Sequence, residues 1–292
     1  MKIIGKLLSR NMKLFFRDKT SVFFSLLSVI ILISLYLIFL SNLQYDSVKQ
    51  AVGNIKGIKF LINSWIMGGL VSIVAFTSTL GAFGSMVGDK EKENANDFMV
   101  SPIKNVHIVA GYVLSSAIVG LIMTIFAAIF SEVFIYIDNG SLLDVGSMVK
   151  VLAVVFLSVI MATVINMFIA SLVRTMSAFT AVSTVIGTLI GFLTGVYVPI
   201  GSLPSTVRYI IMFFPPSHAG LVLKKIVMAK PLSEVFKNAP SSVISSYKTQ
   251  YGVDFLIKGH NITISESILY MVAVTVIFFV LILVVRRKSK IK

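Results

Sequence analysis

The sequence predicts an all-α integral membrane protein with six transmembrane helices. Apolar residues fill 57% of the 292 positions and charged residues only 13%, against about 45–50% and about 25% in soluble domains. Uncharged runs of about 20 residues, the length that crosses a bilayer core as a helix, recur along the chain. These runs are continuous and lack the polar/apolar alternation of transmembrane β-barrels. We therefore expect a single transmembrane domain over residues 1–292.

The expected elements follow a simple order. A helix on the membrane surface covers 1–19, a polar loop covers 88–105, and a long outer segment covers 199–265. The transmembrane helices are expected at 20–41, 61–87, 108–137, 148–173, 176–198 and 266–285. The first apolar run is long enough to remain as a helix rather than be removed as a signal peptide.

Both ends of the chain are basic, and this sets the expected orientation. Six Lys and Arg precede residue 20, and five follow residue 285. Positive charge flanking membrane spans marks the cytoplasmic side, so the net charge of +14 does not call for nucleic-acid binding. An even number of crossings returns the chain to its starting side. We expect a multi-pass protein of the cell membrane with cytoplasmic N- and C-termini.

The N-terminal residues form an amphipathic pattern when they are projected at 100° per residue. A helix with this pattern lies on the membrane, with its basic edge toward anionic lipid. The alternative is a plain positive anchor without a separate helix. The basic edge covers an arc of about 80° and consists of Lys2, Lys6, Arg10, Lys13 and Arg17.

The polar loop reads GDKEKENANDFMVSPIKN and carries four acids and three lysines. Residues 91–100 can form about three helical turns, and Ser101-Pro102 disfavours continuation of the helix. Phe98 and Met99 are apolar side chains in a polar loop, as expected of a docking contact. The alternative is a solvated loop with incidental charges.

Small residues recur at four-residue spacing in two predicted helices, a pattern that lets helices approach closely. In the fifth helix we expect a tight contact, either across a dimer or within the chain. The third helix carries the line Ser116, Gly120, Thr124, Ala128 and Glu132, and the fifth carries Ser183, Gly187, Gly191 and Gly195.

Apart from Glu266 at the first position of the last span, Glu132 is the one acid within a predicted span, and intramembrane carboxylates are candidates for function. At 1.5 Å per residue from Ile108, however, Glu132 would lie roughly 36 Å along the helix, at the outer interface. We therefore favour a solvated carboxylate at the rim over a proton or substrate site.

The outer segment divides into two parts. The first has two apolar stretches of about ten residues, too short to span and therefore predicted to be re-entrant or interfacial. The second, 229–265, is mixed polar and is expected to form a small exposed cap. The first part contains four of the seven prolines, Pro199, Pro204, Pro215 and Pro216.

The chain carries no motif for nucleotide hydrolysis or hydrolytic catalysis. It lacks G-x-x-x-x-G-K-[ST], G-x-S-x-G and H-E-x-x-H, and it has no cysteine. His107, His218 and His260 stand at separate positions, where we expect solvated or interfacial side chains rather than ligands. We predict no catalytic residue, no metal site and no enzyme activity in this chain.

Three stretches, in order, resemble the ABC-2 type permeases, the membrane subunits of ABC exporters. The acidic loop followed by SPI, with Gly111 opening the next span, is similar to the first cytoplasmic loop of that family. The stretch GVYVPIGSLPSTVRYIIMFFPPSHA is similar to the end of helix five and the apolar segment after it. The amphipathic N-terminus is similar to the connecting, or elbow, helix of the family.

The resemblance implies that residues 91–101 form a coupling helix in a cleft of a separate ATP-binding subunit. That subunit would hold ATP and Mg, and this chain would need no cofactor of its own. Arg174, between the fourth and fifth helices, would lie near a second contact with the same subunit. The implied coupling residues are Glu91, Glu93, Asn94, Asn96, Asp97, Phe98, Met99, Ser101, Pro102 and Arg174.

The chain departs from the family at one place. The family usually has a Gly-Thr-(Glu)-hydrophobic run before SPI, where this chain has NANDFM. The departure bears on which ATP-binding subunit the chain pairs with.

The resemblance further implies a homodimer, or a heterodimer with a related permease, whose substrate route is capped on the outside by the segment with the four prolines. The function implied is export of an amphiphile (a drug, lipid, peptide or glycan) from the cytoplasm or inner leaflet, including multidrug or antibiotic efflux in a bacterium. The alternative is an ion-coupled carrier or channel, which would place charged sites at mid-depth on broken helices.

Overall fold

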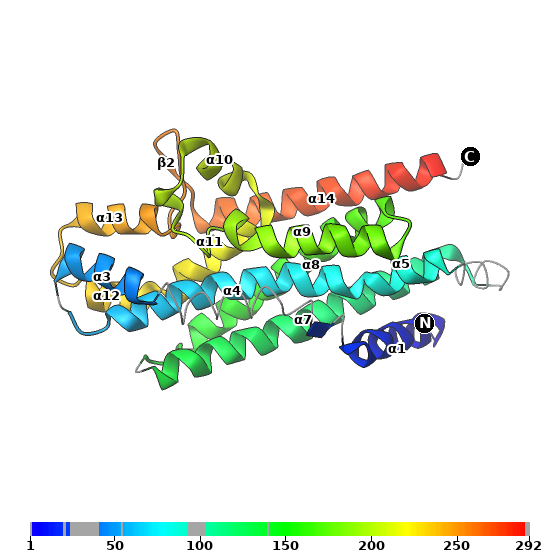
Figure 1. The fold of residues 1–292 in the computed structure, drawn as a ribbon, viewed down its shortest axis with the longest axis horizontal. Helices are drawn as coiled ribbons and strands as arrows, with labels where there is room; N and C mark the ends of the chain where they lie inside the picture. Colours follow the sequence, from blue (N-terminus) through cyan, green and yellow to red (C-terminus); the bar gives the residue numbers. More distant parts are fainter. Residues whose placement is uncertain are drawn as a thin grey trace.

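The computed structural model describes residues 2–19, 22–23, 41–53, 55–92, 103–138 and 140–289. These residues form an elongated helical bundle with one two-stranded antiparallel hairpin (Figure 1). The elements are α1 Lys2–Arg17, α3 Ser41–Val52, α4 Ile58–Ala82, α5 Gly84–Glu91, α7 Asn105–Ile137, α8 Val145–Leu172, α9 Met176–Leu193, η2 Ile200–Ser202, α10 Ser205–Phe213, α11 Pro215–Val227, α12 Ala229–Val235, α13 Ser241–Gln250, β1 Leu256–Ile257, β2 His260–Asn261 and α14 Ile264–Ser289.

Five helices in the described residues are long and apolar enough to cross a membrane. They are Ile58–Glu91 (α4 with α5), α7, α8, α9 and Ile264–Val285 of α14, and they correspond to the second through sixth predicted spans. The first predicted span, 20–41, lies outside the described residues except at its edges. The prediction of an all-α membrane protein is confirmed.

The helix Ile58–Glu91 is the axis of the bundle. In its most apolar window 94% of residues are buried, against 17% in α9 and in α14. It packs against α7, α8 and α11 (Figure 1). The hydroxyls of Thr77, Ser78 and Thr79 donate to carbonyls one turn earlier in the same helix. These hydrogen bonds satisfy the three buried hydroxyls within the helix itself.

Close approach of small residues joins α7 and α8 to α4. The Ser116 hydroxyl on α7 donates to the Thr79 carbonyl at 2.8 Å, and Gly120 faces Thr79 one turn further along. From α8, the buried Asn166 amide donates to the Phe76 carbonyl at 2.8 Å and to the Thr79 hydroxyl at 2.7 Å. The line of small residues predicted on the third span therefore lies at a helix contact within the chain.

Helix α9 ends at Leu193, five residues before the predicted end at 198. Gly195 adopts a left-handed conformation with φ of 61°, and the Val196 N–H donates to the Gly191 carbonyl at 2.9 Å. These two features close the helix with a Schellman motif, which favours glycine at its left-handed position.

The two ends of the bundle differ. We call the end that carries α1, α5 and the C-terminal part of α14 the α1 end, and the end that carries α3, α12 and α13 the cap end (Figure 1). Helices α10 and α11 meet at 87° near Phe214. The cap has an aromatic core, because Tyr247 stacks on Tyr251 and Trp65 donates to the Tyr251 carbonyl at 2.6 Å. Helix α3 was not predicted from the sequence.

We expect Gly120→Leu to destabilise the bundle. A β-carbon at Gly120 would lie 2.3 Å from Cγ2 of Thr79 and 3.3 Å from Cγ1 of Val159, so both α4 and α8 would have to move. Overpacking of this kind costs about 1–3 kcal/mol. Thermal unfolding in detergent measures the change, and Ile122→Leu, at an exposed position of α7, is the control. Equal unfolding temperatures for both variants would contradict the close contact.

Candidate functional site

Three helices meet at the carboxylate of Asp89, close to the end of α5. The guanidinium of Arg10, from α1, donates to both oxygens of Asp89 at 2.7 and 2.8 Å. The Tyr112 hydroxyl, from α7, donates to Oδ2 of the same carboxylate at 2.5 Å. Paired N–H···O bonds from arginine give strong and directional contacts to a carboxylate. We call Arg10, Asp89 and Tyr112 the Asp89 cluster.

The Asp89 cluster is largely shielded from solvent. The Asp89 side chain is 8% exposed, and that of Arg10 is 35% exposed. The hydrogen bonds from Arg10 to Asp89 hold the pKa of the guanidinium above its usual value. Removal of one partner would leave a buried charge uncompensated, which is the costly way to break such a pair.

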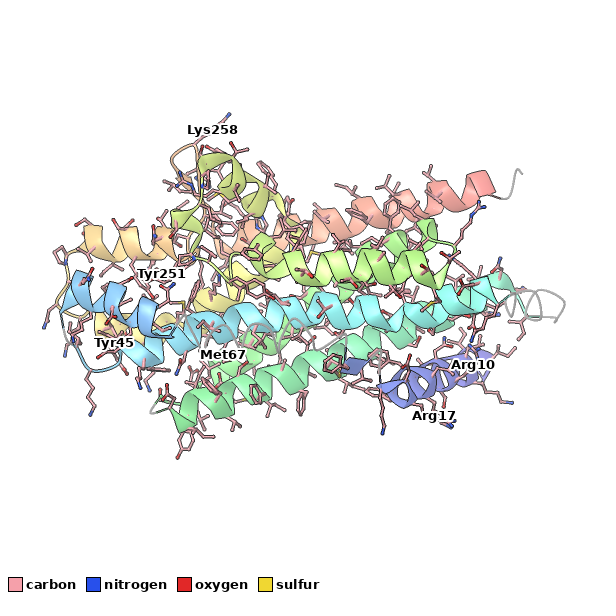
Figure 2. All side chains as sticks on the ribbon, in the orientation of Figure 1. Arg10, Arg17, Tyr45, Met67, Tyr251 and Lys258 are labelled. Carbon is pink, nitrogen blue, oxygen red and sulfur yellow. The ribbon has the colours of Figure 1, made fainter. Side chains whose placement is uncertain are left out.

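Helix α1 reaches this position because one face of it packs on α7. Leu7, Asn11 and Phe15, spaced four residues apart, are buried, and a β-carbon at Gly111 would lie only 2.8 Å from that of Leu7. Arg10 therefore belongs to an ion pair, although its position on the basic edge indicated a contact with lipid (Figure 2).

The other residues of the basic edge are not part of the Asp89 cluster. Lys6, Lys13 and Arg17 are exposed, and the side chain of Lys2 lies outside the described residues. The pattern thus predicted the helix and its exposed lysines but missed the role of Arg10.

Helix α5 also contacts the ends of α8 and α9. Lys90 donates to the Ala170 carbonyl, near the end of α8, at 3.0 Å. A β-carbon at Gly88 would meet the Met176 side chain at the start of α9 at 3.6 Å. Arg174, which the resemblance assigned to a second coupling contact, is exposed in the short connection between α8 and α9.

The structure describes only the first of the predicted coupling residues in the acidic loop. Glu91 is exposed and is the last residue of α5, so it ends the long helix rather than beginning a separate one. The others, Glu93, Asn94, Asn96, Asp97, Phe98, Met99, Ser101 and Pro102, lie outside the described residues. The chain is described again from Ile103, and α7 begins at Asn105.

At the cap end, the predicted glycines serve contacts within the chain. A β-carbon at Gly191 would collide with the ring of Tyr197, and one at Gly195 would lie 2.3 Å from the Ile200 side chain. Gly187 is partly buried in α9. The structure thus accounts for Gly191 and Gly195 without a second copy of the chain.

The four prolines of the segment that was expected to cap the substrate route stand at the starts of short helices. Pro199 and Pro204 precede η2 and α10, and Pro215 and Pro216 open α11. Proline is suited to a first helical turn because its fixed φ is helical and its missing N–H would have no partner there.

Sequence reasoning missed two groups at the cap end. Lys224 is 1% exposed on α11, donates to the Gly195 carbonyl at 3.0 Å, and lies 5.3 Å from the centre of the Trp65 ring. His218 is buried between the Met212 carbonyl and the Ser267 hydroxyl, so of the two expected settings, solvated or interfacial, the solvated one is wrong. The lysine pair inside the apolar run LVLKKIVM was the available signal for the first.

The site contains hydrogen-bonding and ionic groups. Among the described residues no group of three or more His, Cys, Asp or Glu could hold a metal ion. The Asp89 cluster and Lys90 connect α5 to α1, α7 and α8.

These features define a multi-pass helical membrane protein with a buried ionic cluster at one end of the bundle. A family model described as "ABC-2 family transporter protein" matches residues 42–284. The chain belongs to this family, and the resemblance inferred from the sequence is confirmed. The family makes it a membrane component of an ABC transporter rather than the catalytic component. Searches of curated proteins and of solved structures find no match.

We expect the Arg10–Asp89 pair to couple α1 to α5 energetically. Arg10→Gln and Asp89→Asn, made singly and together, should give non-additive losses in unfolding free energy, with a coupling on the order of 1 kcal/mol. Reversible unfolding in mixed micelles provides the values. The exposed pair Lys13→Gln and Glu234→Gln is the control and should be additive. Additive losses for Arg10 and Asp89 would contradict the link.

Proposed function

We propose that this chain is the membrane subunit of an ATP-driven exporter and that residues 91–102 dock on a separate ATP-binding subunit. ATP binding would bring two such subunits together and displace the docked segments. The membrane helices would then change between inward-facing and outward-facing or closed states. ATP and Mg would be bound by the partner alone.

The observation that carries this proposal is the position of the Asp89 cluster. Asp89 lies two residues before Glu91, where the proposed docking segment starts, and it holds α1 and α7 to α5. A displacement of the segment would therefore move three helices together. One of them continues as the 34-residue helix Ile58–Glu91, which is roughly 50 Å long and reaches the cap end.

The second proposed contact, at Arg174, would lie on the same end of the bundle as Glu91. Arg174 is exposed next to Ala170 and Met176, and α5 contacts both of these residues. A subunit that covers the segment after Glu91 could reach Arg174 on the same end of the bundle. We infer that the α1 end faces the cytoplasm, in agreement with the basic residues of α1 and of the last turn of α14.

The remaining parts fit an exporter for amphiphilic substrates. The segment that carries the four prolines, together with the bend between α10 and α11, would act as an outer re-entrant gate. Val185, Leu189 and Phe192 form an exposed apolar face on α9, which a second permease or lipid would cover. The dimer contact would use this face rather than Gly191, whose contact is with Tyr197.

We expect Phe98→Asp combined with Met99→Asp to abolish association with the ATP-binding subunit while membrane insertion remains normal. The two side chains are the apolar residues of a polar segment, and charge at a docking contact is strongly unfavourable. Co-purification of the tagged chain with a Walker-A protein in mild detergent is the measurement. Ile55→Asp, at an exposed position before α4, is the control.

Unchanged co-purification of the double variant would overturn the docking assignment. Recovery of the unaltered chain alone, with no associated ATPase, would overturn the exporter proposal itself and favour an ion-coupled carrier or channel.

A further inference from the structure

Two cavities adjoin each other near the cap end, between α4, α7, α8 and α11. The larger has a volume of about 330 Å³ and the smaller about 190 Å³. The volume of the larger is near the lower end of the range of about 300–1,000 Å³ that holds small molecules. Both cavities are lined by Glu132, Ile135, Leu143 and Val227. We call the larger the chain chamber and the smaller the head chamber.

The chain chamber is apolar along its length. Its lining includes Val71 of α4 and runs on α7 from Ile125 to Glu132, and these two residues of α7 are roughly 10 Å apart along the helix. Besides Glu132, its one other polar side chain is Ser131, whose hydroxyl already donates to the Ala127 carbonyl at 2.7 Å. The chamber therefore suits an alkyl chain whose polar end lies at Glu132.

The chain chamber opens on the outer surface of the helix bundle. Ile129 and Val133 on α7 are 58% and 48% exposed, and Met148 and Leu152 on α8 are each 44% exposed. All four line the chamber. Since α7 and α8 are both membrane-spanning candidates, a molecule dissolved in the bilayer could enter between them.

The head chamber contains polar groups that lack partners. The hydroxyl oxygens of Ser64 and Ser141 are buried and make no hydrogen bond among the described residues. Both residues line the chamber, and Ser64 is fully buried. An unpaired hydroxyl in such a place loses the hydrogen bonds that water would give it, so a ligand with donors would satisfy it.

The charges in the head chamber favour a cation. Glu132 accepts one hydrogen bond, from the Leu143 N–H at 3.0 Å, and has no basic partner among the described residues. Asp144 caps α8 by accepting from the Ser147 N–H, and the hydrogen bonds from Ser147 hold the pKa of its carboxyl below the usual value. The chamber thus presents two carboxylates against one exposed lysine, Lys230.

We propose that these two chambers form a binding site for an amphiphile with a primary ammonium head and a single alkyl chain in the site. The ammonium donates to Glu132 and to the hydroxyls of Ser64 and Ser141, and the chain lies between α7 and α8. Two sources supply this chemistry. One is a free alkylamine, and the other is an aminophospholipid, whose phosphate would lie near Lys230.

The test is photolabelling of the purified chain in nanodiscs of phosphatidylglycerol, which has no amine. The probe is decylamine with a diazirine near the end of its chain. We expect saturable labelling of residues that line the chain chamber, blocked by unlabelled decylamine but not by decyl sulfate. The assay needs no ATP-binding subunit, so its result does not depend on the proposed export function.

Glu132→Gln keeps an acceptor for the Leu143 N–H but removes the charge, and we expect it to weaken labelling roughly tenfold, as for loss of a charge-assisted hydrogen bond. Glu234→Gln, an exposed acid of α12 outside both chambers, is the matched control and should label normally. Val151→Trp, which fills the chain chamber, should abolish labelling. A thermal unfolding measurement on each variant identifies any that fails to fold.

The source is distinguished by adding phosphatidylethanolamine to the nanodiscs. If phosphatidylethanolamine competes with the probe in the unaltered chain but not in Lys230→Gln, the site is assigned to the lipid. If phosphatidylethanolamine does not compete with the probe, the site is assigned to free alkylamines. Equal labelling of Glu132→Gln and the unaltered chain, or equal competition by decyl sulfate, would overturn the proposal.

Discussion

The structure depends on the burial of one long helix, Ile58–Glu91, inside the bundle, where 94% of its most apolar window is buried. Every polar group on this helix needs a partner within the protein. The hydroxyls of Thr77, Ser78 and Thr79 donate to carbonyls of the same helix. Asn166 and Ser116 donate to it from neighbouring helices, and Asp89 accepts from Arg10 and Tyr112 at its end. These partners come from α1, α7 and α8. The hydrogen bonds that satisfy the polar groups of the central helix therefore also position the helices around it.

The two ends of the central helix are held by different chemistry. At the α1 end, the Asp89 cluster and Lys90 form charged contacts close to the membrane surface. At the cap end, the Trp65 indole N–H donates to the Tyr251 carbonyl, the ammonium of Lys224 lies 5.3 Å from the centre of the Trp65 ring, and the Asn63 amide donates to Asp138 at 2.6 Å. A directional ion pair two residues before Glu91 and a shielded aromatic cluster at the cap would suit the proposed function, in which the helix receives force at one end and anchors the cap at the other.

Hydropathy in the sequence predicted the spanning helices and the polar loop, because these follow from runs of residues that are contiguous in the chain. The small residues of the third span marked a contact, but they did not say with which helix. The pairing of Arg10 with Asp89 joins residues 79 positions apart, and no local pattern carries that information. Similarly, the unpartnered hydroxyls of Ser64 and Ser141 are visible only when α4 and the α7–α8 connection are placed together.

In the proposed mechanism α1 and α5 move as one unit, and spin-label distances test this most directly. The chain has no cysteine, so Lys13→Cys on α1 and Lys92→Cys after α5, both exposed, can be labelled without other changes. Pulsed electron paramagnetic resonance should give a single narrow distance distribution that broadens when Asp89→Asn is added. Distributions that are equally broad with and without Asp89→Asn would contradict the link between the two helices.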